Sequence, residues 1–318
     1  MTSLQTKIPE IVIAPASGFC AGVSSAINCV TKLLEQNPDH RVIIDGELVH
    51  NRLVCDELYH KGAYLLSDKT RDHEIAITDV TPDDIVVIRA HGAPLQRRHQ
   101  LKCIGCKIID ATCPLVQKIT DIVISQQDRN IILLGEKDHA EAIGLKSYAP
   151  WVCICENLDE VASLYSYIKN NKTTWAKTET LLIDERRTWS FRPNKSWVLV
   201  CQSTLNVSFL QATKEFFAKE NFSIEVFDTI CVATKLRQKG IEAIAKCDAV
   251  IVIGGKNSAN TKRLFQNASQ KVKYVWWMED VSELAGVQWE QFSIIGLTAG
   301  ASTPPKQILA FRDAILKK

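Results

Sequence analysis

The sequence predicts an α/β protein whose parallel sheets are covered by helices on both faces. Short apolar runs rich in Ile and Val recur along the chain, and longer amphipathic stretches separate most of them. Strands that are buried on both faces of a parallel sheet read as continuous apolar runs of this kind. Turns rich in Gly, Ser, Asn and His follow many of the runs, at the strand ends where parallel sheets bind their ligands.

The expected elements alternate along almost the whole chain. Each expected strand is a short apolar run, and each expected helix repeats apolar residues at the spacing of one helical face. Strands are expected at 10–14, 41–45, 84–89, 106–110, 130–134, 150–155, 196–201, 223–227, 249–253, 273–277 and 292–296. Helices are expected at 22–36, 51–60, 114–128, 157–169, 206–219, 233–247, 258–269 and 304–317.

The strand ends fall into three similar groups, which predict three α/β domains. The expected ranges are 10–110, 111–228 and 229–318. No sequence repeat links the groups, so threefold pseudosymmetry is a hypothesis about architecture alone.

The segment 171–197 interrupts the alternation and is interpreted as an insertion in the second domain. A loop of this length is usually functional or disordered. One interpretation is a surface hairpin whose tryptophans pack on the domain, and the other is a docking surface for an acidic electron-transfer protein. The residues that prompt both are Trp175, Trp189, Trp197, Arg186, Arg187 and Arg192.

The composition excludes several classes of protein. The chain has 318 residues, of which 46% are hydrophobic and 23% charged, as in a globular protein of two or three domains. A net charge of +2 provides no strong field for nucleic acid or a membrane surface. No apolar run approaches the ~18–20 residues of a spanning helix, and residues 1–9 lack a secretion signal. We therefore expect a cytoplasmic protein without nucleic-acid or membrane partners.

Eleven cysteines in a reducing compartment argue against a disulfide framework and leave room for metal chemistry. Cys20, Cys113 and Cys231 each lie where an expected strand gives way to a turn and then to an expected helix. The helix dipole favours a thiolate at such a position, which makes the sulfur a better ligand. Three thiolates on a [4Fe-4S] cluster would leave one iron open for a substrate. The alternative is that these cysteines are small buried hydrophobes.

Two closer cysteine pairs are more typical of structure than of metal binding. Cys103 and Cys106 form a CxxC, but no second pair stands at the spacing of a zinc site. Cys153 and Cys155 lie inside an apolar strand, so one of the two thiols is expected to face the core.

Two glycine-rich turns favour the binding of an anion. The segment 254–260 offers backbone N–H groups and polar side chains at a helix start, although capping by Asn257 or Ser258 explains the same residues equally well. The segment 298–302 repeats the pattern before a helix that begins with prolines. Together with histidines at other strand ends, the two turns would suit a diphosphate.

Three histidines and one glutamate follow expected strand ends. His50, His91 and His139 stand at turns that also hold Gly or Asn, and are harder to dismiss as structural than a lone histidine. Glu141 stands at an expected helix start, where a carboxylate can cap the helix. In a closed pocket the same carboxylate would donate or relay protons.

At these residues the sequence resembles the IspH/LytB family of 4-hydroxy-3-methylbut-2-enyl diphosphate reductases. The resemblance runs from about residue 10 to residue 315, and several independent motifs occur in the order of the family. The motifs are Gly18-Phe19-Cys20-Ala21-Gly22-Val23, Val49-His50-Asn51-Arg52, Ala90-His91-Gly92, Asp110-Ala111-Thr112-Cys113-Pro114-Leu115-Val116, the segment 254–260 and Thr298-Ala299-Gly300-Ala301-Ser302.

The resemblance implies three α/β domains in a cloverleaf, with pseudo-threefold symmetry, around a central [4Fe-4S] cluster. It implies reductive dehydroxylation of the diphosphate substrate to isopentenyl and dimethylallyl diphosphates, the last step of the methylerythritol phosphate pathway, with electrons from a ferredoxin or flavodoxin. It makes Glu141 the proton-relay carboxylate. By resemblance, the cluster ligands are Cys20, Cys113 and Cys231, and the substrate-binding residues are His50, His91, His139, Ser203, Thr204, Ser258, Asn260 and Ser302.

The chain also departs from the family pattern. Arg89 stands where a small polar residue is usual, Ala259 replaces a serine, and Lys235 replaces a threonine after Cys231. Two further interpretations therefore stay open: a relative that reduces another allylic or phosphorylated substrate, and a non-catalytic iron–sulfur sensor. A zinc protein would need a fourth ligand that the sequence does not offer near these cysteines.

Overall fold

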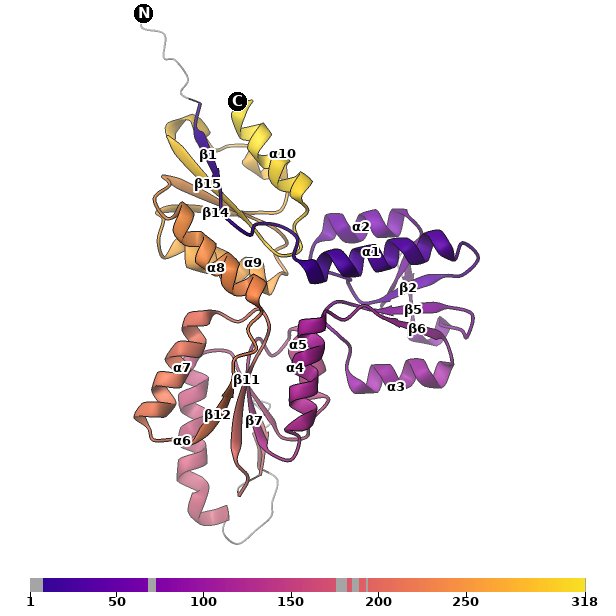
Figure 1. Ribbon diagram of the computed structural model, residues 1–318, viewed down its shortest axis with the longest axis vertical. Coiled ribbons are helices and arrows are strands. Elements are labelled where there is room, and N and C mark those ends of the chain that lie inside the picture. The colour runs from indigo at the N-terminus through magenta and orange to yellow at the C-terminus, as the bar shows by residue number, and fades with distance from the viewer. Residues whose placement is uncertain (1–7, 68–72, 176–181, 185–188, 193, 318) are drawn as a thin grey trace, which may run out of the picture. The chain divides into compact units, whose positions relative to one another are not determined.

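The computed structural model describes residues 8–67, 73–175, 182–184, 189–192 and 194–317 of the chain (Figure 1). These residues form three parallel sheets and one antiparallel hairpin. The chain divides into two compact units. Unit 1 comprises Met1–Ser24, Val49–Leu58 and Val232–Lys318, and unit 2 comprises Ser25–Leu48 and Tyr59–Cys231.

Unit 1 is built on a four-stranded parallel sheet in the order β1-β15-β13-β14 (Figure 1). Alternate residues of β13 point to opposite faces: Ile251 and Ile253 pack with α10, whereas Val250 and Val252 pack with α8 and α9. The elements are β1 (Glu10–Ile13), α2 (Arg52–His60, whose last two residues belong to unit 2), α8 (Val232–Ile244), β13 (Ala249–Ile253), α9 (Ala259–Ser269), β14 (Tyr274–Met278), two 3-10 helices (Val281–Leu284 and Trp289–Gln291), β15 (Ile294–Ala299) and α10 (Pro305–Leu316).

Unit 2 contains the other two parallel sheets. The first has the order β4-β3-β2-β5-β6, and α3 packs on one of its faces through Leu101. Helix α1 (Ala21–Gln36) begins in unit 1 and continues into unit 2. The elements of this part are β2 (Val42–Asp45), β3 (Ala63–Leu66), β4 (Glu74–Ile75), a 3-10 helix (Ile77–Asp79), β5 (Ile85–Ile88), α3 (Leu95–Ile104) and β6 (Lys107–Asp110).

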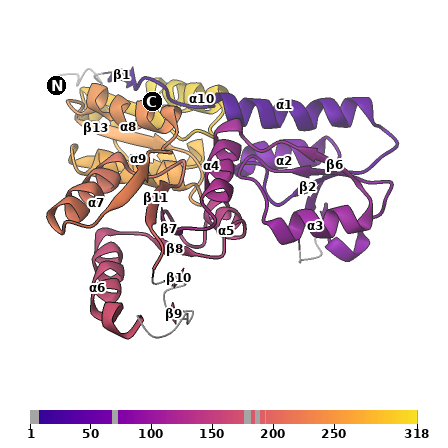
Figure 2. The same cartoon turned by 60° about the horizontal axis from the view of Figure 1, so that its bottom comes forward.

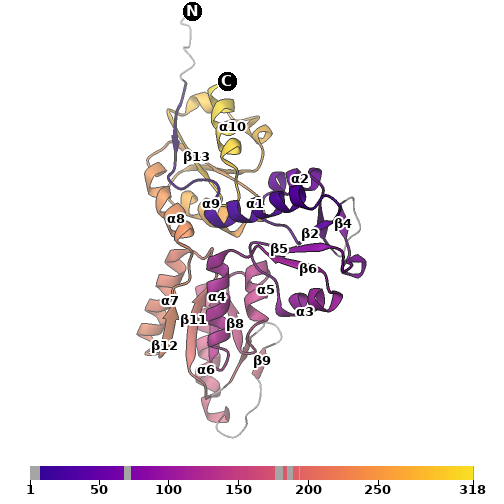
Figure 3. The same ribbon diagram turned by 45° about the vertical axis from the view of Figure 1, so that its right-hand side comes forward.

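The second sheet of unit 2 has the order β12-β11-β7-β8 and is covered by helices on both faces (Figure 3). Ile132 and Leu134 of β7 pack with α6 and α7, whereas Ile131 and Leu133 pack with α4 and α5. The elements are α4 (Pro114–Ser125), β7 (Asn130–Leu134), α5 (Ala140–Lys146), β8 (Val152–Cys155), α6 (Leu158–Trp175), β9 (Leu182–Asp184), β10 (Trp189–Phe191), β11 (Trp197–Cys201), α7 (Val207–Lys219) and β12 (Ile224–Phe227).

The segment 171–197 contains an antiparallel hairpin, β9 with β10, and β10 lies beside β8 (Figure 2). Trp189 and Trp197 are buried in the core of this part of unit 2, which confirms for these two residues the interpretation of tryptophans packed on the domain. The Arg192 guanidinium stacks over the Trp151 ring at 4.4 Å. Arg186, Arg187 and the side chain of Trp175 lie outside the described residues.

The predicted fold class is confirmed, with one difference in how the strands are shared among the sheets. The strand expected at 10–14 opens the range 10–110, but β1 pairs with β15 in the sheet built from the range 229–318. A short apolar strand carries no signal of its partner, because pairing is decided by contacts distant in sequence. The three ranges otherwise stay a prediction.

Several elements were not expected from the sequence, namely β3, β4 and α3, whereas α5 was expected only as a helix start and β9 and β10 only as one interpretation of the insertion. They are short, and α3 carries mostly polar and charged residues. Cys153 and Cys155 are both fully buried, because each of them belongs to the core that α6 and α7 cover. Among the residues that the structure describes, every helix is too short or too polar to cross a bilayer.

Candidate functional site

Glu141 lies in a buried hydrogen-bonded group at the strand ends of the second sheet in unit 2. It is in the first turn of α5, and its side chain is fully buried. Ser203, which follows β11, donates its backbone N–H to Glu141 Oε1 at 2.7 Å and its hydroxyl to Glu141 Oε2 at 2.6 Å. Since β7 and β11 are neighbours in the sheet, their carboxyl ends bring these two turns together.

The surroundings of Glu141 suit proton transfer. Burial raises the pKa of the Glu141 carboxyl from 4.5 to about 7, although the hydrogen bonds from Ser203 act in the opposite direction. A carboxyl group that titrates near neutral pH can both hold and release a proton under ordinary conditions. Glu141 therefore has the protonation behaviour of a general acid, whereas a surface carboxylate would remain charged.

Two predicted histidines accompany Glu141 in unit 2. His139 is the N-cap residue of α5, and its Nδ1 accepts the backbone N–H of Glu141 at 3.1 Å. A neutral ring that accepts at Nδ1 carries its proton on Nε2, so Nε2 can donate to an anion. The ring of His91 packs edge-to-face against that of His139, with centroids 5.4 Å apart.

Backbone hydrogen bonds tie two of the predicted cysteines to the same turns. The N–H of Cys113, the N-cap residue of α4, donates to the carbonyl of Ala90 at 3.0 Å, next to His91. The N–H of Cys231 donates to the carbonyl of Ser203 at 2.9 Å, and α8 begins at the next residue. Unit 2 therefore carries one linked set of predicted residues, which comprises His91, Cys113, His139, Glu141, Ser203, Thr204 and Cys231.

Gln202 shapes these turns, and sequence reasoning did not assign it a role. It is 1% exposed; its Oε1 accepts the N–H of Glu136 at 2.8 Å, and its Nε2 donates to Thr204 Oγ1 at 3.0 Å. Glycine suits position 135, since a Cβ there would lie 2.7 Å from Gln202 Oε1 and 2.9 Å from Gln202 Cβ, and the Gln202 side chain would have to shift. Its position directly after a strand was the available signal, but an amide side chain does not point to any particular chemistry.

In unit 1, the turn that carries Cys20 is held by the end of β15. The Cys20 N–H donates to the carbonyl of Ala301 at 3.2 Å, and the Gly18 N–H donates to that of Ala299 at 3.4 Å. The N–H of Val23, in the first turn of α1, donates to Cys20 Sγ at 3.4 Å. This hydrogen bond holds the Cys20 sulfur at the start of α1.

The two glycine-rich turns of unit 1, after β13 and after β15, both contact the backbone carbonyl of His50. The Ser302 hydroxyl, after β15, donates to the carbonyl of His50 at 2.9 Å. A Cβ on Gly255, after β13, would lie 2.6 Å from the same carbonyl oxygen, so only glycine fits. The N–H of Ser258 donates to the carbonyl of Gly255 at 3.1 Å, which closes the turn before α9.

The N-terminus of α9 contains buried polar groups that point to an anion. Ser258 caps the helix by accepting the N–H of Thr261 at 3.3 Å. Within the described residues, the Asn260 Nδ2 and the Thr261 Oγ1 are buried and have no hydrogen-bond partner. A Cβ on Gly300 would lie 2.1 Å from Thr261 Oγ1, so the turn after β15 closes over this helix start. Unpaired donors at a helix N-terminus are suited to phosphate oxygens.

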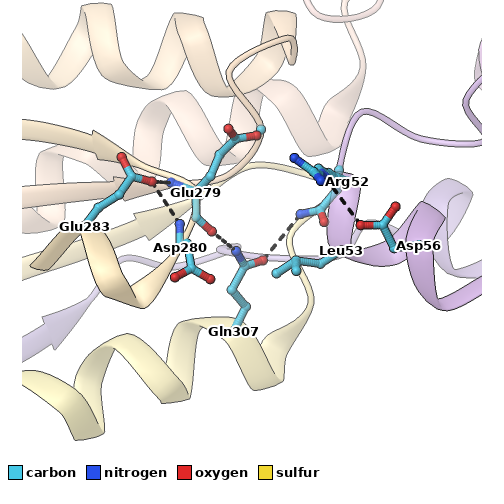
Figure 4. Close-up of a pocket in the computed structure, with 9 residues that line it drawn as sticks. Arg52, Leu53, Asp56, Glu279, Asp280, Glu283 and Gln307 are labelled. Carbon is cyan, nitrogen blue, oxygen red and sulfur yellow. Dashed lines mark hydrogen bonds and ion pairs between the residues drawn. The ribbon is translucent and has the colours of Figure 1, made fainter.

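A pocket of about 380 Å³ in unit 1 is lined in part by Asn51 and Arg52, the two residues after His50 (Figure 4). Its wall includes Glu279, Asp280 and Glu283, so the pocket repels a phosphate group. Figure 4 shows Gln307 between Glu279 and α2, where it donates to the Glu279 carbonyl and accepts from Asn51 Nδ2 at 3.4 Å. These contacts anchor the residue after His50, and we assign the pocket a structural role.

Of the residues that depart from the family pattern, Arg89 is held in an ionic cluster of unit 2. Its guanidinium lies against Gly46, where a Cβ would come within 2.5 Å of Nη1, and Asp45 and Glu47 stabilise its charge. Burial lowers the pKa of Arg89 and raises the pKa of Asp45. The charge of Arg89 is therefore balanced by acids of the neighbouring strand end.

The exposure of the cysteines separates the predicted ligands from most of the others. Cys20, Cys113 and Cys231 are half-buried, and each lies at the start of a helix. Thiols that solvent reaches at helix starts fit a metal cluster in donor chemistry and accessibility. The cysteines that are buried instead are Cys55, Cys106, Cys153, Cys155, Cys201 and Cys247.

Fold and site together define a class: an α/β protein with a buried acid, turns suited to an anion and helix-start thiols at its strand ends. The sequence model described as LytB protein matches residues 11–316. The chain therefore belongs to the LytB family.

Two similar proteins carry the same functional name. A Treponema denticola protein named 4-hydroxy-3-methylbut-2-enyl diphosphate reductase is 36% identical over 298 residues, which cover 92% of this chain and 93% of that protein. The Thermotoga maritima protein of the same name is 32% identical and covers 93% of this chain and 92% of its own length.

A solved structure, the E-1-hydroxy-2-methyl-but-2-enyl-4-diphosphate reductase from Plasmodium falciparum, matches with a TM-score of 0.79 at 29% identity, over 96% of this chain and 87% of that one. A second solved structure, titled as the terminal enzyme of the non-mevalonate pathway, matches with a TM-score of 0.62 at 28% identity. The family assignment thus has support from both sequence and fold.

Proposed function

We propose that this protein is a reductase that converts 4-hydroxy-3-methylbut-2-enyl diphosphate to isopentenyl and dimethylallyl diphosphates. The observation that carries the proposal is the fully buried Glu141, whose pKa is about 7 and whose carboxyl group is hydrogen-bonded to Ser203. Removal of a hydroxyl group needs a proton for the leaving oxygen, and a neutral carboxyl group in a dry site can supply it.

Cys20, Cys113 and Cys231 are the proposed ligands of a [4Fe-4S] cluster, since family membership implies an iron–sulfur group and these thiols have suitable exposure. When bound, such a cluster supplies single electrons and an iron that acts as a Lewis acid. The protein contributes the positions of the thiols. Backbone bonds from Cys113 to Ala90 and from Cys231 to Ser203 hold two of them beside the turns of His91 and Glu141.

The diphosphate is proposed to bind to donors at the strand-end turns. In unit 1, the unpartnered Asn260 amide, the N-terminus of α9 and the Ser302 turn beside His50 offer donors. In unit 2, the donors are His139 Nε2 and the ring of its neighbour His91. The proposed substrate-binding residues are His50, His91, His139, Ser203, Thr204, Ser258, Asn260 and Ser302.

Proton delivery is proposed to run through Glu141 and the Ser203 hydroxyl. The two oxygens are 2.6 Å apart, which is a short hydrogen bond along which a proton can be exchanged. Thr204 is fixed next to Ser203 by Gln202, so a second hydroxyl group lies at the same turn.

We further propose that a ferredoxin or flavodoxin delivers the electrons and that the protein acts in the cytoplasm.

The test is anaerobic purification followed by iron and sulfide analysis and by turnover of the diphosphate with reduced viologen. About four irons per chain together with substrate consumption would support the proposal. Glu141→Gln should retain the iron and lose turnover, whereas the exposed Glu215→Gln should behave like the parent. Iron with no turnover in the parent would favour a different substrate, and a chain without iron would contradict the cluster assignment.

A further inference from the structure

Arg237 is a buried cation that joins the turn before Cys20 to a helix. Its side chain is on α8, six residues after Cys231, and the residue is 3% exposed. Its Nη2 donates to the carbonyl of Gly18 at 2.5 Å, and its Nη1 donates to the carbonyl of Ala233 at 2.9 Å. One guanidinium therefore contacts both the turn that carries Cys20 and the first turn of α8.

The inner face of α8 is shaped to receive this turn. Arg237 shares that face with Gly240, Ile241 and Ile244, at the spacing of neighbouring helical turns. A Cβ on Gly240 would lie 2.7 Å from the carbonyl oxygen of Pro15, so the helix backbone approaches the turn as closely as glycine permits. The side chain of Arg237 extends toward the helix N-terminus, as helical side chains do, and this direction places its end beside Ala233.

The Gly18 turn needs such support. Ala16 has a φ of 60°, which is unfavourable for a residue with a Cβ, and Gly18 has a φ of 88°, which glycine adopts readily. The N–H of Gly18 makes a long bond of 3.4 Å to Ala299, and the carbonyl of the same residue is the acceptor of Arg237. The guanidinium thus fixes the peptide unit that precedes Phe19 and Cys20.

A buried guanidinium is costly to desolvate, which argues for a specific role. Taking a cation out of water carries a desolvation cost, and an apolar side chain would fill the same space without it. A planar fork can serve two carbonyl acceptors in fixed directions, which an ammonium group on a flexible stem cannot do equally well. The geometry is therefore one that lysine would reproduce only in part.

We propose that Arg237 is a positioning residue for the cluster ligand Cys20. By bridging Gly18 and Ala233, it sets the direction in which the Cys20 side chain points. It also connects the Cys20 turn to α8, the helix that begins directly after the proposed ligand Cys231. The inference rests on the proposed function, because it assumes that Cys20 binds the cluster.

The test compares Arg237→Met, Arg237→Lys and the control Arg312→Met in the full chain. Arg312 is also in unit 1, but its side chain is 39% exposed and pairs with its neighbour Asp313. The first readout is the rate at which a chelator removes iron from the reconstituted protein. The second readout is the alkylation rate of Cys20 in the metal-free protein, measured by mass spectrometry with Cys113 as the internal reference.

We expect Arg237→Met to release iron about 10- to 100-fold faster, as for other residues that orient metal ligands, with Arg237→Lys between it and the parent. In metal-free Arg237→Met, alkylation of Cys20 should rise relative to Cys113, while Arg312→Met should match the parent in both readouts. Parental secondary structure by circular dichroism shows that a variant has folded.

Folded Arg237 variants with parental rates in both readouts would overturn the inference. If neither Arg237 variant folds, the residue serves folding and not the position of Cys20, which also overturns it. A parent chain that binds no iron would contradict the proposed function. In that case the alkylation of Cys20 in the metal-free protein still decides whether Arg237 holds the turn.

Discussion

The hydroxyl of Ser203 donates to Oε2 of Glu141 at 2.6 Å, and the backbone N–H of the same serine donates to Oε1 at 2.7 Å. One residue thus donates a hydrogen bond to each oxygen of a fully buried carboxyl group. Ser203 also accepts the N–H of Cys231 through its carbonyl. A single turn after β11 therefore connects the proposed proton donor to a proposed metal ligand.

Removing the Ser203 hydroxyl should shift the pH dependence of turnover. The hydrogen bond from this hydroxyl lowers the pKa of Glu141 against the effect of burial, so Ser203→Ala should raise that pKa above about 7. If protonated Glu141 is the acid, kcat falls as pH rises through its pKa, and in the variant this fall should move to higher pH. The check is the pH profile of kcat, with the exposed Ser208→Ala as control. A pH profile of kcat that does not shift in Ser203→Ala would show that Glu141 is not the acid in the rate-limiting proton transfer.

Glu141 should also make stability depend on pH. Its folded pKa of about 7 lies above the ordinary value of 4.5, so the folded protein binds this proton more tightly than the unfolded chain does. The contribution of Glu141 to stability is therefore fully present below about pH 4.5 and is lost as pH rises through 7, by about 3 kcal/mol. In Glu141→Gln this contribution should vanish. Urea unfolding from pH 5 to pH 8 compares the parent, this variant and Glu215→Gln, which should follow the parent.

Loss of a proposed ligand should remove metal, whereas loss of another half-buried cysteine should not. Cys20→Ser replaces the thiol whose sulfur accepts the Val23 N–H, and we expect the reconstituted protein to hold fewer than four irons or none. The matched control is Cys29→Ser on α1, because burial raises the pKa of the Cys29 thiol and thus disfavours a thiolate. Iron and sulfide analysis distinguishes the two variants. Equal losses in both would argue against a specific ligand role for Cys20.

The Asn260 amide should matter for binding more than for chemistry. Its Nδ2 is buried without a partner at the start of α9, so Asn260→Ala removes a donor that only a ligand would use. We expect KM for the diphosphate to rise about tenfold, equivalent to one lost hydrogen bond to a charged group, with a smaller change in kcat. Steady-state kinetics measure both constants, and the exposed Gln266→Ala on the same helix is the control. A drop in kcat at constant KM would contradict a binding role.

Much of this site was predictable because parallel sheets place their ligands at strand ends. Glu141 and Ser203 stand 62 residues apart in sequence, yet each follows an apolar run, and β7 and β11 prove to be neighbours. The pairing itself was not predictable, because an apolar run does not specify its partner strand. The same limit explains why β1 was grouped with the strands that follow it in sequence.

Residues that act through geometry were harder to find than residues that carry chemistry. Gln202 and Arg237 were not singled out, because an amide or a guanidinium in a helix or turn usually faces solvent. Their importance follows from contacts with distant backbone, such as that of Arg237 with Gly18. Thr261 is similar, since its buried hydroxyl is apparent only when the turn of Gly300 closes over it.

The pairing of β1 with β15 also has a consequence for the order of events during synthesis. While the ribosome is still adding residues 232–293, the segment that carries Cys20 has emerged but its neighbouring strand does not yet exist. Unit 2, which is complete at Cys231, can fold in that interval, whereas the turn of Cys20 has to wait for β15. The Cys20 turn can therefore form its hydrogen bonds to Ala299 and Ala301 only after translation of β15.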